Sequence, residues 1–110
     1  MPSWTLYHQI FVMRQGNARM IWLGVPFAET ISFSESRIYD AIPMPPTDAG
    51  DVLIAFTCSR NNEIDDSLVV IASRPKGDEP ATDIHYAWRI DPTSTTLQPV
   101  NYPDIECWSY

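Results

Sequence analysis

The chain has few of the basic residues that nucleic-acid binding requires. Among its 110 residues Lys76 is the single lysine, and six arginines are spread along the chain without a run, whereas 14 residues are acidic and the formal net charge is −7. Contact with a nucleic-acid backbone usually needs a clustered basic face. We therefore expect no nucleic-acid partner, and the acidic surface suits a basic protein partner instead.

The usual motifs for metals, cofactors and nucleophiles are absent from the sequence. His8 and His85 are far apart, and neither a CxxC nor an HExxH motif occurs. No glycine-rich phosphate loop follows an expected strand, and no serine lies in a nucleophile elbow. The oxygen-rich run 61–66 lacks the spacing of an EF-hand and is interpreted as a solvated turn. We expect no metal and no cofactor.

Long hydrophobic runs are also missing. No apolar stretch approaches the roughly 20 residues that a membrane-spanning helix needs. The first residues, MPSWTLYH, do not combine a basic region with an apolar region in the way a signal peptide does. The sequence therefore predicts a cytoplasmic protein without membrane contact.

Cysteine is scarce, since Cys58 and Cys107 are the only two. In a reducing compartment they would remain thiols. Both lie in apolar, strand-like surroundings, where cysteine behaves as a small buried hydrophobic residue. We expect two buried thiols. The alternative is a disulfide, which would stabilise the fold by roughly 4 kcal/mol because it closes a long loop.

Alternating hydrophobicity is the clearest positive feature, and it is most regular in residues 82–91. A β-strand sends successive side chains to opposite faces. One parity of this segment is apolar: Ile84, Tyr86, Trp88 and Ile90. The other parity is mostly polar: Asp83, His85, Ala87, Arg89 and Asp91. The pattern predicts a strand with the tryptophan face buried, on which Ala87 and Arg89 tolerate substitution.

Similar patterns predict further strands, separated by polar turns that contain glycine, proline or asparagine. Residues 67–73 are apolar on both parities, which indicates a central strand buried on both faces. We expect residues 1–110 to form a single mainly β domain, an antiparallel barrel-like or sandwich-like fold of about seven or eight strands. The other expected strands are 4–13, 18–25, 51–59, 95–100 and 105–110.

The segment 29–43 has two interpretations. Ser32 is followed three residues later by Glu35, which matches a helix capping box, and Pro43 would stop the helix. This pattern favours one short helix near 33–41. The competing interpretation is a strand at 30–33 followed by a loop.

The polar parity of the 82–91 segment is also the one candidate for catalysis. Side chains two residues apart on a strand are about 7 Å apart, so Asp83 can meet His85 and orient it as a general base, with Arg89 further along the same face. An enzyme that uses Asp83, His85 and Arg89 is therefore one alternative. It requires His85 at the rim of a cleft. The ordinary interpretation is a solvated face.

Aromatic residues point to binding rather than to catalysis. Tyrosine and tryptophan are enriched at protein interfaces. Our leading hypothesis is a small acidic β-rich interaction module without catalytic activity, which contacts a protein partner or a second copy of itself through an aromatic edge or its acidic face. A small-molecule-binding β-barrel is a further alternative. The candidate binding residues are Trp108, Tyr110, Tyr102, His85 and Arg89.

Overall fold

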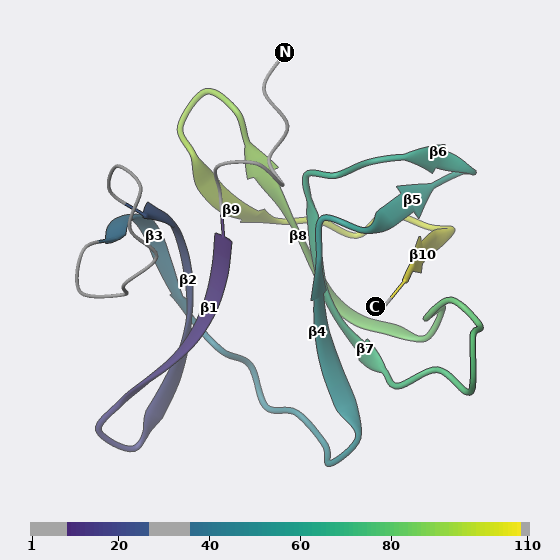
Figure 1. Cartoon of the computed structure of the whole chain (residues 1–110), viewed down its shortest axis with the longest axis horizontal. Coiled ribbons are helices and arrows are strands. Elements are labelled where there is room, and N and C mark those ends of the chain that lie inside the picture. The colour runs from purple at the N-terminus through teal and green to yellow at the C-terminus, as the bar shows by residue number, and fades with distance from the viewer. Residues whose placement is uncertain (1–8, 27–35, 109–110) are drawn as a thin grey trace.

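The protein has a mainly β, antiparallel fold, as the sequence predicts. In a computed structural model, residues 9–26 and 36–108 are described, and these two ranges form ten strands in three sheets and no helix (Figure 1). The number of strands exceeds the predicted seven or eight because residues 36–43 and 63–64 form additional strands and the predicted strand 51–59 is divided into two. Within these ranges there is no helix long and apolar enough to cross a membrane.

The first sheet is a meander of β1 (Gln9–Gln15), β2 (Ala18–Pro26) and β3 (Ser36–Pro43). The strands expected at 4–13 and 18–25 are present in their described parts and form a hairpin: Gln15 pairs with Ala18, and Gly16 takes a left-handed φ of 62° in the turn. Glycine adopts this conformation without the steric cost that a side chain would add.

The helix predicted near 33–41 is wrong for its described part. Residues 36–43 form β3, which pairs with β2 from Pro26–Ser36 to Met20–Pro43. A capping box is a local signal, whereas pairing with β2 satisfies the backbone hydrogen bonds of the whole segment. The alternative strand at 30–33 lies outside the described residues, as does the first part of the strand expected at 4–13.

The central sheet contains β4 (Asp51–Ala55), β7 (Leu68–Ser73), β8 (Ile84–Asp91) and β9 (Thr96–Pro99), in that order. Every neighbouring pair in this sheet is antiparallel. β7 is a central strand whose apolar residues are all buried, which confirms the sequence-based expectation.

The third sheet consists of β5 (Cys58–Arg60), β6 (Glu63–Ile64) and β10 (Ile105–Cys107), in the order β10-β5-β6. The run 61–66, expected to be a solvated turn, contains β6, which pairs with β5 in a tight hairpin over residues 58–64. Its two turn residues Asn61 and Asn62 have left-handed φ values of 54° and 65°, as a type I′ turn requires. The hairpin leaves the central sheet after Phe56, whose φ of 71° redirects the chain.

The central sheet has a hydrophobic core on each face. Toward the first sheet, Val69 and Ile71 of β7 pack with Trp88 and with Ile21 of β2. Toward the third sheet, the alternate residues of β7 pack in a second core: Leu68, Val70 and Ala72, together with Ala87, Cys58, Cys107 and Ile105. The three sheets therefore form layers, with the central sheet between the other two (Figure 1).

The apolar parity predicted for residues 82–91 holds for only half of the strand. Trp88 and Ile90 are buried, as expected, and face the first sheet. A β-bulge interrupts the first half of the strand. Ile71 pairs with Tyr86, whereas the next residue of β7, Ala72, pairs with Ile84. The extra residue, His85, shifts Ile84 to the opposite face, where it packs against the second core.

Two further expectations for this strand are wrong. Tyr86 was expected inside, but its side chain is 39% exposed and stacks on Trp88, with ring centroids 6.2 Å apart. Ala87 was expected to be a tolerant outer position, but it is buried at 9% exposure because the third sheet covers that face. A sheet covered on both sides leaves no purely polar face.

Candidate functional site

The bulge residue His85 lies in a hydrogen-bonded cluster with residues of two neighbouring strands. Its Nε2 atom lies 2.8 Å from the Ser73 Oγ atom, and the Ser73 hydroxyl also donates to Asp83 Oδ2 at 2.9 Å. Asp51 Oδ1 lies 3.6 Å from the same Nε2 atom, and Asp83 Oδ2 lies 3.9 Å from it. The predicted meeting of Asp83 with His85 therefore occurs, with Ser73 as an intermediate.

This cluster does not have the geometry of a catalytic triad. In a Ser–His–Asp triad the serine and the carboxylate bind opposite nitrogens of the imidazole ring. Here Ser73, Asp51 and Asp83 all approach Nε2. Arg89 lies four residues further along β8, about 13 Å at the rise of a β-strand. The structure thus brings Asp83 and His85 together but places Arg89 elsewhere, half-buried beside Gln98 and Leu68.

Metal ligands do not converge in the part of the chain that the structure describes: it contains no group of three histidine, cysteine or carboxylate side chains placed to hold a metal ion. His8, the other histidine, lies outside the described residues.

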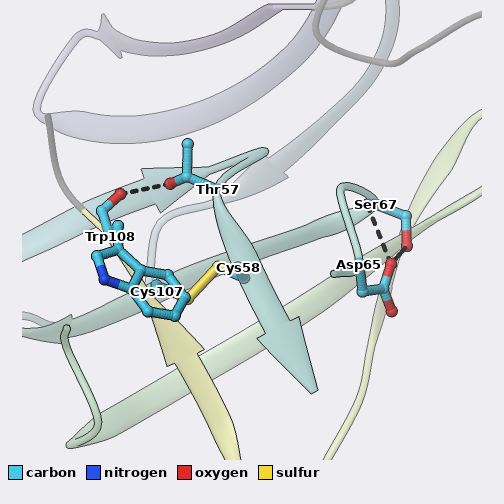
Figure 2. The surroundings of a disulfide bond; sticks show 6 residues. All are labelled: Thr57, Cys58, Asp65, Ser67, Cys107 and Trp108. Carbon is cyan, nitrogen blue, oxygen red and sulfur yellow. Dashed lines mark hydrogen bonds between the residues drawn. A yellow bond between two sulfur atoms is a disulfide. The ribbon is translucent and has the colours of Figure 1, made fainter. Parts of the chain in front are cut away.

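The cysteines form a disulfide, which corrects the expectation of two buried thiols. Cys58 of β5 and Cys107 of β10 lie opposite each other and are bonded (Figure 2). The adjacent Trp108 donates its backbone N–H to the Thr57 carbonyl at 3.0 Å and accepts a hydrogen bond from the Thr57 hydroxyl. Cross-strand contacts therefore fix the position of Trp108.

Trp108 and Ile64 line an apolar depression of about 560 Å³ on the third sheet. Ile64 is the most exposed large apolar residue of the described ranges, at 89%. Thr57, Cys58, Asn62 and Glu106 also line this depression. Trp108 was one of the predicted binding residues, whereas Ile64 was not. Tyr110, the other predicted terminal aromatic, lies outside the described residues.

A second depression, of about 600 Å³, is predominantly polar. Its lining contains three carboxylates, Asp83, Asp104 and Glu106, and no lysine or arginine. The turn residues of the β5–β6 hairpin, 61–62, form one side, and residues 82–84 form another. The predicted binding residue Tyr102 also borders it, with the Arg60 guanidinium carbon 4.2 Å from the centre of its ring.

A third depression, of about 320 Å³, is lined by His85, Tyr86 and Tyr102 together with Pro99 and Val100. Two of the predicted binding residues, His85 and Tyr102, therefore line the same depression. The exposed Tyr86 adds a further aromatic side chain to this depression.

The acidic depression adjoins each of the other two, and together we call the three the β10 groove. The apolar and acidic depressions share Asn62 and Glu106. The acidic and aromatic depressions share Ile84, Tyr102 and Ile105. The groove therefore has an acidic centre between an apolar end at Trp108 and an aromatic end at His85.

Sequence reasoning found some of the groove and missed its centre. Trp108, Tyr102 and His85 were predicted as binding residues because the type of side chain alone, aromatic or imidazole, indicates a possible binding role. Glu106 and Asp104 were not predicted as binding residues, because nothing in the sequence distinguishes them from the other carboxylates of an acidic chain. The two left-handed asparagines were recognisable as a turn, and this turn signal could have placed the β5–β6 hairpin.

Comparison of the chain with protein-family models, with curated proteins and with solved structures finds no match. The assignment of a function therefore depends on the geometry of the molecule itself.

Proposed function

We propose that the protein is an interaction module without catalytic activity, and that it binds another protein through the β10 groove. The observation that carries this proposal is the pairing of Ile64 with Trp108 in one open apolar depression. A side chain as large as isoleucine at 89% exposure is an anchor point for a partner, because a bound protein would remove its surface from water.

The arrangement of the groove also supports protein binding over the two alternatives. Each depression has the size of a small-ligand site, but the largest is lined mainly by asparagine, threonine and carboxylate side chains rather than by the apolar residues typical of such sites. The His85 cluster has its serine and carboxylates around one ring nitrogen, which favours a structural role for the cluster.

The proposal is tested by selection from a random peptide library displayed on phage. Wild-type protein should enrich specific peptides, and Ile64→Asp should lose them, because a charge would replace the apolar anchor. Val12→Asp is the matched control, since Val12 is also exposed but lies on β1 of the first sheet. It should retain the same peptides.

Self-association is measured on the same proteins by analytical ultracentrifugation. A dimer that is present in wild type and lost in Ile64→Asp would identify a second copy as the partner at this surface. If no peptides are enriched and the protein is monomeric, or if both variants behave as wild type does, the proposed function is wrong.

The cytoplasmic location stays a prediction, and the disulfide gives a means to test it. Disulfides persist in oxidising compartments, whereas those in the cytosol are usually transient. Alkylation of the protein in freshly lysed cells, before any reductant is added, would show whether Cys58 and Cys107 are bonded there. Free thiols in these cells would agree with the cytoplasmic prediction.

A further inference from the structure

We infer that the β10 groove recognises an extended peptide segment that places a lysine or arginine side chain in its acidic centre, with apolar side chains at both ends. This inference rests on the proposed function and specifies its partner. It depends on three features of the groove: the charge of its centre, the apolar character of its ends and the adjacency of its three depressions.

The charge of the centre selects a cationic side chain. Asp83, Asp104 and Glu106 face one depression whose lining contains no basic residue. The Asp83 side chain is 73% exposed, and its Oδ2 atom has the Ser73 hydroxyl as a donor. A lysine or arginine that entered would form charge-assisted hydrogen bonds with these carboxylates.

Three cations lie close to this depression, and none of them lines it. Arg74 and Lys76 line a neighbouring depression that shares Thr82 and Asp83 with it. Arg60 lies beside Tyr102. Its guanidinium lies over the ring of Tyr102, and its Nε atom lies 3.9 Å from Asp65. Arg60 is absent from the residues that line the depression. It therefore supports the wall formed by Tyr102 and leaves the carboxylates of the centre for a partner.

The two ends of the groove select apolar side chains. Ile64 and Trp108 offer a site at one end, and Tyr86 with Pro99 and Val100 offers one at the other. An extended chain advances about 3.3 Å per residue and turns alternate side chains to the same face. Such a chain can place an apolar, a basic and a second apolar side chain in successive depressions.

An extended segment fits this surface better than a small molecule does. Each of the three depressions is already about as large as one small-ligand site. A peptide of about twelve residues is roughly 40 Å long when extended, and the longest dimension of the protein is 38 Å. One peptide can therefore cross all three depressions.

The test uses three synthetic peptide pools of about twelve randomised residues each. The pools are identical except at the central position, which is lysine, norleucine or glutamate. Norleucine keeps much of the length of lysine without its charge. The fraction of each pool retained on the immobilised wild-type protein is measured by mass spectrometry at low and at physiological salt. We expect the lysine pool to be retained most and the glutamate pool least.

A charge-neutral double variant, Asp104→Asn with Glu106→Gln, then locates the interaction. It should weaken retention of the lysine pool by about ten-fold, which corresponds to about 1.4 kcal/mol, and leave the norleucine pool unchanged. The matched control is Asp78→Asn with Glu79→Gln, which makes the same charge change on exposed residues outside the groove. Circular dichroism verifies that both variants are folded.

The outcomes separate this inference from the proposed function. Equal retention of the lysine and norleucine pools, with loss of both in Ile64→Asp, would overturn the inference and leave the proposed function standing. An equal effect of the two double variants would also overturn it, because the attraction would then come from net charge alone. Retention of no pool, in a protein that is also monomeric, would overturn both.

Discussion

Cys58 and Cys107 lie directly opposite each other on antiparallel strands, with their Cα atoms 4.0 Å apart and a disulfide between them. The N–H and C=O groups of Cys107 bond to Ala81 on its other side, at 3.0 and 2.7 Å. Cys58 and Cys107 are therefore a non-hydrogen-bonded pair, the type in which opposing Cα atoms approach most closely. The disulfide and the Ala81 bridge therefore hold β10 on both sides at Cys107. The neighbouring residue of β10, Glu106, lines the groove.

The first prediction concerns the stability that this bond confers. Replacing both residues, Cys58→Ala with Cys107→Ala, should lower the free energy of unfolding by about 4 kcal/mol, because a cross-link across 49 residues restricts the unfolded chain. Urea unfolding of the two proteins, followed by tryptophan fluorescence, measures the difference. An unchanged midpoint, or equal alkylation of wild type with and without reductant, would contradict the disulfide.

The second prediction concerns the core between the first and central sheets. Trp88 is 8% exposed and packs with residues of β2, β7 and β9. Trp88→Ala should destabilise the protein by about 3–5 kcal/mol, through lost burial and the cavity that remains. Tyr86→Ala is the control, since it removes the aromatic ring that stacks on Trp88 at the surface. If chemical denaturation shows that Trp88→Ala and Tyr86→Ala lose the same free energy of unfolding, Trp88 is not the buried residue of the pair.

The third prediction concerns the opposite face of the same strand. Ala87 is buried in the core that contains Val70, Cys58 and Cys107. Ala87→Leu should destabilise the protein by about 1–3 kcal/mol, because a larger side chain overpacks this core. The matched substitution Ala49→Leu, at an exposed position before β4, should be close to neutral. Thermal unfolding monitored by circular dichroism compares the two variants, and similar melting temperatures would contradict the burial of Ala87.

Much of the fold could be predicted from the sequence because most strands carry their own periodicity. Apolar residues on both parities of 67–73 identified β7 as central. The sequence Asp91-Pro92 is typical of a turn, and it marks the start of the β8–β9 connection. Asp91 accepts hydrogen bonds in this turn from the N–H groups of Thr93 and Thr95, at 2.8 Å in both cases. Such signals are local, so a sequence reveals them without a partner strand.

The errors arose where long-range pairing overrides a local pattern. No feature of the sequence at residues 84–86 predicts the bulge at His85, because the bulge depends on the pairing register of β8 with β7. Similarly, the capping box at Ser32 could not show that residues 36–43 pair with β2. The β10 groove combines residues from three separate parts of the chain, so its individual aromatic residues were predictable but its acidic centre was not.

Asp40 provides the fourth prediction, because it connects the first sheet to the central sheet. Its Oδ2 atom accepts the backbone N–H of Leu97 in β9 at 2.7 Å, and its Oδ1 atom accepts the N–H of Ala41 at 2.9 Å. Leu97 is buried in the shared core, so its amide depends on this carboxylate. Asp40→Ala should cost about 1.5–3 kcal/mol of stability, the range for a hydrogen bond to a charged group.

Amide hydrogen exchange makes this prediction specific to one contact. In Asp40→Ala the Leu97 amide should lose protection more than the amides of β7, because it loses its acceptor while β7 keeps its ladder. Protection of the Leu97 amide in Asp40→Asn should lie between that in wild type and that in Asp40→Ala, since an amide oxygen can accept one of the two N–H groups. Unchanged protection of Leu97 in Asp40→Ala would show that β3 and β9 are not connected in this way in solution.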